Sequence, residues 1–176
     1  GKKKLTIDDF LAFREELLPQ LESVHHVSYD EDIKALNQLP LEEIKAPTVL
    51  EVGKTTHLIT FELKYEIGEE RFPVNDYNSF THNQQEHIKV IRAKDKLIRY
   101  LPDPSITEDI LDMLLDSAAN RAKRGSTNPY LATFPLSALR TVNDQILPKA
   151  EQYFTVRYQE GVDLTLHELP VEFSVD

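Results

Sequence analysis

A run of strict alternation from Thr56 to Ile67 is the feature that most constrains how this chain can fold. From Ile59 onward, apolar side chains occupy every second position of the run, and polar side chains occupy the positions between them. Because successive side chains of a strand point to opposite faces, this period of two predicts a strand with one buried and one wet face. That pattern is typical of an antiparallel sheet. The apolar positions are Ile59, Phe61, Leu63, Tyr65 and Ile67.

Three further strands are expected to follow in chain order. A turn at 68–71 leads to a return strand that starts at Phe72 and Val74, and the polar stretch Asn75–Gln85 is interpreted as a loop. A second hairpin is predicted from the apolar residues of 88–91 and 97–101, which flank a polar turn at 93–96. Four strands in this order would form a meander.

Helices are expected on both sides of these strands. Near the N-terminus, the capping box Thr6–Asp9 precedes an apolar stripe at helical spacing, and the box Ser28–Glu31 opens a second helix that ends before Pro40. Later, a helix is predicted from Ser105 to a C-cap at Gly125, and another over 136–146 that Pro148 ends or kinks. The last strands are expected at 153–158, 162–166 and 171–175. The residues of the first stripe are Phe10, Phe13, Leu17, Leu21 and Val24.

These elements predict an α+β fold, with an N-terminal helical pair packed with a curved antiparallel sheet and two further helices before the last strands. Pro47 marks the change of pattern, so we expect an N-terminal helical segment at 1–47 and a sheet domain at 48–176, which fold together as one cooperative domain. The stripe from Phe10 to Val24 is wide enough to pack on the core and also on a second copy, so 1–47 is a possible dimerisation segment.

Composition excludes several classes of site. The formal net charge of −10 disfavours binding to the phosphate backbone of nucleic acids, and the absence of Cys excludes disulfides and thiolate chemistry. The sequence has no Gly-rich phosphate loop, no His-Glu-x-x-His metalloprotease motif and no Gly-x-Ser-x-Gly serine hydrolase motif. We therefore expect no enzymatic activity and no cofactor. The best metal-ligand candidates are the pair His25 and His26 and the set His82, Glu86 and His87. The adjacent side chains of the pair would diverge on a helix, and the spacing of the set needs a helical turn and leaves no third ligand in reach, so no metal is expected.

Two other features bear on location and partners. No apolar run is long enough to span a bilayer, and the chain begins Gly1-Lys2-Lys3-Lys4 without an initiator Met. We expect that a signal peptide or membrane anchor preceded it, and the alternative is that the three lysines are an ordinary solvated start. Six tyrosines offer either core packing or an interface surface, at positions 65, 77, 100, 130, 153 and 158.

The stretches Phe10–Val24, Ser28–Leu39 and Ile59–Ile67 together resemble the extracytoplasmic domain of the assembly-platform proteins of conjugative type IV secretion systems. The resemblance implies a nuclear-transport-factor-2-like fold in a bitopic membrane protein whose soluble domain lies outside the cytoplasm. It also implies a non-enzymatic scaffold that self-associates and binds other channel subunits, and the lack of Cys would fit a Gram-positive host. The helices at 106–124 and 136–148 come later than in the simplest version of that fold.

Two other functions remain open at the level of sequence. One is a cytoplasmic domain that binds a protein partner or has a regulatory role. The other is a pocket between helices and sheet that binds a small ligand, which is where α+β domains commonly hold one.

Overall fold

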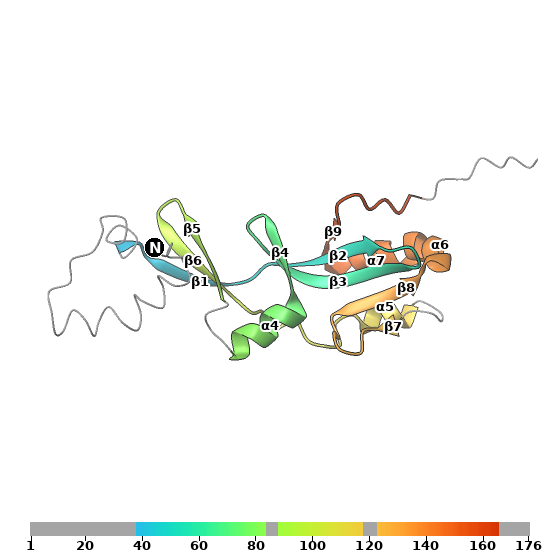
Figure 1. Cartoon of the computed structure of the whole chain (residues 1–176), viewed down its shortest axis with the longest axis horizontal. Helices are drawn as coiled ribbons and strands as arrows, with labels where there is room; N and C mark the ends of the chain where they lie inside the picture. The colour runs from blue at the N-terminus through green and yellow to red at the C-terminus, as the bar shows by residue number, and fades with distance from the viewer. Residues whose placement is uncertain (1–37, 84–87, 118–122, 166–176) are drawn as a thin grey trace, which may run out of the picture. The chain divides into compact units, whose positions relative to one another are not determined.

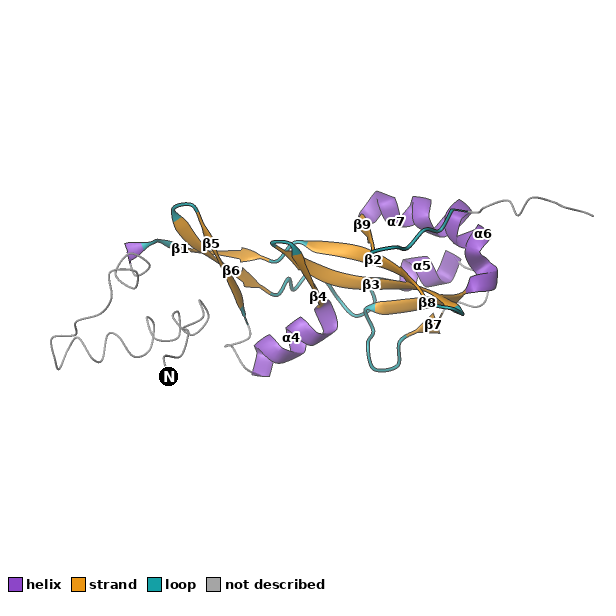
Figure 2. Ribbon diagram, turned by 45° about the horizontal axis from the view of Figure 1, so that its top comes forward, coloured by secondary structure: helices purple, strands orange, loops and turns teal. Residues whose placement is uncertain are grey.

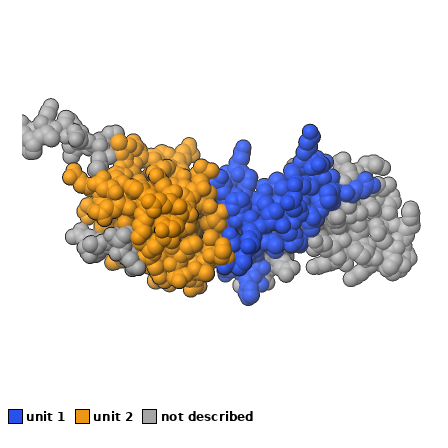
Figure 3. Space-filling view, turned by 180° about the vertical axis from the view of Figure 1, so that it is seen from behind, with its two compact units in different colours: residues 1–47, 65–104 blue, residues 48–64, 105–176 orange. Residues whose placement is uncertain are grey.

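The computed structural model describes residues 38–83, 88–117 and 123–165 (Figure 1). The chain forms two compact units, each assembled from two separate stretches (Figure 3). Unit 1 contains residues 1–47 and 65–104, and unit 2 contains residues 48–64 and 105–176. The elements are mixed helices and strands with a curved sheet, which confirms the predicted α+β class.

Unit 1 contains a three-stranded sheet in the order β1-β6-β5, with β1 at Leu41–Lys45, β5 at Lys89–Ala93 and β6 at Lys96–Leu101. The hairpin predicted around 93–96 is confirmed, because β5 and β6 pair antiparallel from Lys89↔Tyr100 to Ala93↔Lys96. β1 joins them by pairing in parallel with β6. Leu97 is fully buried at the centre of this small sheet, against Leu39, Leu41 and Val90.

The described part of unit 1 also contains helix α4 (Val74–Asn83), which follows directly on strand β4 (Glu70–Pro73). Pro73 suits the residue before a helix because it needs no N–H partner, and Asp76 lies in the first turn, where a negative charge is favoured by the helix dipole. The rings of Tyr65 and Tyr77 pack edge to face with centroids 5.1 Å apart. The Tyr65 hydroxyl donates to Asn78 Oδ1 at 2.8 Å, which holds α4 against the end of the long strand.

Unit 2 is built on a sheet in the order β7-β8-β3-β2-β9. Its strands are β2 (Thr48–Lys54), β3 (Leu58–Ile67), β7 (Lys123–Arg124), β8 (Leu131–Pro135) and β9 (Thr155–Tyr158), and β3 runs on into unit 1 from Tyr65. The alternation of β3 is confirmed, since Ile59, Phe61, Leu63, Tyr65 and Ile67 are buried and the polar side chains between them are half-buried, while Leu58 at the start of the strand is exposed. β8 pairs antiparallel with β3, whereas β9 pairs in parallel with β2.

The helical part of unit 2 consists of α5 (Asp112–Ser117) and a continuous run made of η3 (Leu136–Ala138), α6 (Leu139–Thr141), the π-helical turn η4 (Val142–Ile146) and α7 (Leu147–Tyr153) (Figure 2). Val142, Ile146 and Ala150 are buried on this run, as are Phe61 and Phe134 on the sheet. The run passes through Pro148 instead of ending there. Pro148 has no backbone N–H to donate to the preceding turn of a regular helix. The π turn at 142–146 occupies that preceding turn, where the regular hydrogen bonding is already interrupted.

Several expected elements are wrong. Residues 75–83 of the expected loop belong to α4, which occupies 74–83, and Val74 starts that helix and not a return strand. The helix predicted over 105–125 is α-helical only at 112–117 within its described part, and Lys123–Arg124 form β7, where cross-strand pairing with β8 replaces the expected helix end. Residues 162–165 have no regular structure, and the simple meander is replaced by two sheets that each contain a parallel pair.

Other expectations fall outside the described residues. The stripe residues Phe10, Phe13, Leu17, Leu21 and Val24 all lie there, as do residues 28–37 of the second predicted helix and the strand expected at 171–175. Within the expected N-terminal helical segment 1–47, residues 41–45 form strand β1 and are not helical. The two helices expected before Pro40, their possible role in dimerisation and the nuclear-transport-factor-2-like detail stay predictions.

Candidate functional site

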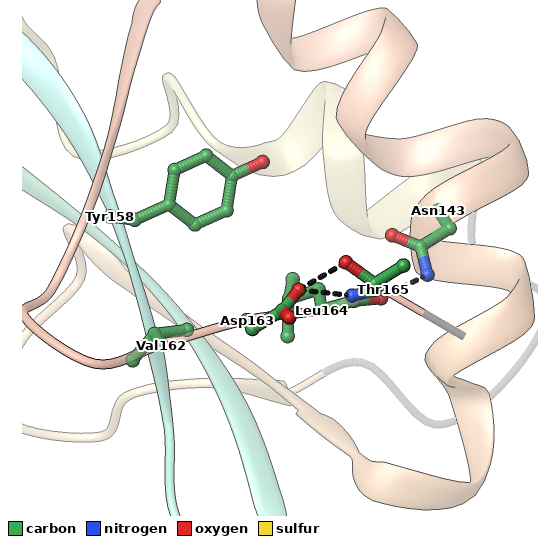
Figure 4. Close-up of a pocket in the computed structure, with 6 residues that line it drawn as sticks. All are labelled: Asn143, Tyr158, Val162, Asp163, Leu164 and Thr165. Atoms are coloured by element: carbon green, nitrogen blue, oxygen red, sulfur yellow. Dashed lines mark hydrogen bonds between the residues drawn. The ribbon is translucent and has the colours of Figure 1, made fainter. Parts of the chain in front are cut away.

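A pocket with a volume of about 580 Å³ lies in unit 2, beside the helical run and the last strand (Figure 4). We call it the C-terminal pocket. The π turn η4 supplies one wall, β9 supplies another, and the irregular segment after Gly161 supplies the third. Gly161 allows the chain to turn after β9 into this segment, because its φ of 78° is in the left-handed region that favours glycine. The lining residues are Asn143, Tyr158, Val162, Asp163, Leu164 and Thr165.

Asn143 fixes the segment that closes the pocket. Its amide nitrogen donates to the carbonyl oxygen of Leu164 at 2.7 Å, and Leu164 is itself buried. Since a carbonyl oxygen only accepts, this hydrogen bond assigns the amide orientation, and Asn143 Oδ1 is directed away from Leu164. Figure 4 shows this oxygen and the Tyr158 hydroxyl facing the same space.

Asp163 and Tyr158 give the pocket its electrostatic character. Asp163 Oδ1 accepts the backbone N–H of Thr165 at 2.8 Å and also the Thr165 hydroxyl, which fixes the carboxylate at the pocket wall. Tyr158 is 42% exposed, and its partial burial raises the pKa of its hydroxyl above the usual value, while the nearby charge of Glu151 raises this pKa further. Tyr158 therefore presents a neutral hydroxyl at physiological pH, in a pocket that the Asp163 carboxylate also lines.

A smaller hollow of about 240 Å³ lies in unit 1, and we call it the α4 groove. Phe72 and Tyr77 give it an aromatic floor, and the centroids of their rings lie 6.1 Å apart. Phe80 stands at its edge with 53% of its surface exposed, and the ammonium of Lys89 lies 5.3 Å from the centre of the Phe72 ring. Pro73 and Asp76 complete the described lining. An exposed aromatic side chain next to an apolar hollow is a common feature of surfaces that bind other proteins.

A polar cluster occupies the sheet of unit 2. Glu51 on β2 is only 5% exposed, and its carboxylate pairs with Lys64 on β3 at 2.7 Å. The side-chain amide of Gln159 donates to the same carboxylate at 3.0 Å. The charge of Glu51 is thus compensated by a cation and a hydrogen-bond donor, so we interpret this cluster as structural.

The metal-ligand candidates from the sequence do not form a site in the described part of the chain. His82 is exposed near the end of α4, whereas Glu86, His87, His25 and His26 lie outside the described residues. Among the described residues, no group of three potential ligands could hold a metal ion. Asn143 and Asp163 belong to no recognisable sequence motif. In the sequence, Tyr158 stands out only as one of six tyrosines available for the core or an interface.

Comparison with known proteins found no matching family model, no matching curated protein and no matching solved structure. Within the described ranges, no helix has both the length and the apolar character required to cross a membrane.

Proposed function

We propose that this chain is a non-enzymatic interaction module that holds together subunits of a membrane-associated assembly, as in the type IV secretion scaffolds that its sequence resembles. The observation that carries the proposal is the half-exposed ring of Phe80 beside the aromatic floor of the α4 groove. Leaving a large apolar side chain in water is unfavourable. Full burial of an exposed Phe contributes about 1.5–3 kcal/mol, so covering the exposed half of the Phe80 side chain contributes about half of that.

The chemistry of the groove favours a partner protein that inserts an apolar side chain. Phe72 and Tyr77 offer ring faces, while Asp76 and Lys89 place one charge of each sign in the lining. An apolar centre with polar groups around it is the usual anatomy of a protein interface. The partner is therefore expected to bring an apolar side chain to Phe80, with polar groups around it.

The location is tested on the parent protein in its own cells. Membrane fractionation, followed by protease treatment of cells stripped of their wall, should find this domain in the membrane fraction and digested from outside. A domain that stays soluble and protected inside would overturn the secretion scaffold and favour the cytoplasmic interaction module.

The groove is tested by placing a photo-crosslinking amino acid at position 80 of the parent protein. The matched control places it at Tyr153, an exposed aromatic of unit 2. Crosslinking at 80 and not at 153, to a membrane-complex subunit identified by mass spectrometry, is the expected result. Equal crosslinking at both positions, or none at 80, would exclude the α4 groove as the interface.

Self-association is a separate part of the proposal and involves the predicted stripe at 10–24. We propose that the chain forms a homodimer through Phe13, Leu17 and Leu21, because the stripe is wider than one packed face requires. Light scattering should give the dimer mass at high micromolar concentration, and Leu17→Glu should give a folded monomer. A monomeric unmodified chain would contradict this, and a Leu17→Glu variant that unfolds would return the stripe to the core.

A further inference from the structure

We propose that the C-terminal pocket binds a small organic cation, an ammonium group carried on a short apolar body. This binding site lies in unit 2 and is independent of the α4 groove on which the proposed function rests.

The polar atoms of the pocket are arranged to accept hydrogen bonds. Asn143 uses its N–H group on the Leu164 carbonyl, so the amide presents its oxygen elsewhere, toward the space that Tyr158 also faces (Figure 4). The Asp163 carboxylate also lines the pocket. An ammonium group has three N–H donors and no acceptor, so it complements these oxygens better than a carboxylate or a phosphate would.

The charges near the pocket also favour a cation over an anion. Asp163 is the one charged side chain among the described lining residues, and Glu151 is close enough to Tyr158 to influence its titration. Asp163 and Glu151 are both exposed, so water screens their charges in part, but two negative charges beside the pocket still favour a cation and repel an anion. The net charge of −10 on the whole chain adds to this preference at longer range.

The remaining walls are apolar and aromatic. Val162 and Leu164 supply aliphatic surface, and the Tyr158 ring supplies a face on which a cation is favoured by about 0.5–2 kcal/mol. The volume of about 580 Å³ is within the range of small-molecule sites. A short alkyl chain with a terminal ammonium therefore satisfies the apolar walls and the acceptors together.

The experiment is an NMR titration of the ¹⁵N-labelled chain with three matched probes: butylammonium, butanol and butyrate. We expect butylammonium alone to shift the Asn143 side-chain amide and the backbone signals of 162–165. Equal shifts with butanol would show an apolar hollow without charge selection and would overturn the proposal. Preference for butyrate, or no shift with any probe, would also overturn it.

Two variants connect the binding to the named groups. Asp163→Asn removes the charge but keeps an oxygen for Thr165, and it should weaken butylammonium binding about tenfold. The control Asp144→Asn removes an exposed acid from the same π turn outside the lining set, and it should leave affinity within about twofold. Equal weakening in both variants would assign the effect to general charge and contradict a built site.

The cation can be a free amine or a lysine side chain of a peptide, which share the same ammonium chemistry. A short peptide with one central lysine distinguishes these sources. Tighter binding of the peptide than of butylammonium assigns the pocket to a peptide, and binding of butylammonium with exclusion of the peptide assigns it to a free amine. Both outcomes support the cation site, and binding of neither overturns it.

Discussion

The hydroxyl of Tyr77 lies between two backbone groups of the β5–β6 hairpin. It accepts the N–H of Lys89 at 2.9 Å and donates to the carbonyl oxygen of Tyr100 at 2.5 Å. Lys89 and Tyr100 are register partners at the open end of the hairpin, so the side chain of a helix completes the strand pairing there. Helix α4 and the small sheet of unit 1 are thereby joined by one hydroxyl group.

Tyr77→Phe should therefore destabilise the chain. The substitution keeps the ring but leaves the N–H of Lys89 and the carbonyl of Tyr100 without this partner, which costs about 1–3 kcal/mol. Urea unfolding measures the change, and Tyr153→Phe, at a residue 60% exposed, is the control that should change little. Equal stability of Tyr77→Phe and the unmodified chain would show that water replaces the hydroxyl without loss.

Lys64→Met should destabilise unit 2 by about 3 kcal/mol, because the nearly buried Glu51 would keep its charge without its cation. Adding Glu51→Gln to this variant should recover more than half of the loss, since the remaining group is neutral. Thermal unfolding compares the variants, with Lys96→Met as the control. Lys96 pairs with Glu42 in an exposed position, where an ion pair contributes about 0–1 kcal/mol. Similar losses for the two lysine variants would refute the assigned importance of burial.

Gly53→Ala should be destabilising by about 1–3 kcal/mol. A Cβ at this position would lie 2.5 Å from Thr60 Oγ1 and 2.7 Å from Gln159 Oε1, and both contacts are too short. Gln159 can move because its side chain is long, whereas Thr60 is fixed on the neighbouring strand. Thr60→Ala in the same chain should restore much of the stability in denaturant unfolding. Failure of this second substitution to restore stability would mean that the Thr60 contact is not the cause.

Tyr158 predicts a loss of stability at alkaline pH. Its pKa in the folded chain is raised by burial and then by Glu151, above the value of about 10 expected when unfolded. Above about pH 10 the unfolded chain releases this proton first, so stability falls as the pH rises through the folded pKa. Tyr158→Phe should lose less stability over that range than the unmodified chain, and absorbance titration should show a lower Tyr158 pKa in Glu151→Gln. Parallel pH curves for the Phe variant and the unmodified chain would contradict the assignment.

The strands with the clearest local pattern were predictable from sequence. β3 has a buried and a wet face, and the β5–β6 hairpin has a compact polar turn, so local residues define both. β2 was missed because it is buried on both faces and shows no alternation, with even Glu51 covered. β1 was missed because its neighbour β6 lies far along the chain, and a parallel pair has no local turn signal.

Helix α4 and the C-terminal pocket show where local reasoning fails. Residues 74–83 are rich in Asn, Ser, Thr and Asp, which favour turns by propensity, and tertiary hydrogen bonds such as Tyr65 to Asn78 hold the helix instead. The pocket joins Asn143, Tyr158 and Asp163 from three separate elements. No fixed spacing relates these residues, so only the folded chain brings them together.

The parallel pairing of β2 with β9 can form only late in synthesis of the chain. β2 leaves the ribosome before any part of unit 1 beyond residue 64, whereas β9 at 155–158 emerges only after residue 104, where unit 1 is complete. Throughout that interval β2 lacks the neighbouring strand that pairs with its outer edge in the folded chain. This strand carries the apolar residues Val49, Leu50 and Val52. An apolar strand with an open edge is a template for aggregation. Between the translation of these two strands the nascent chain is therefore open to aggregation at the edge of β2, however quickly unit 1 folds.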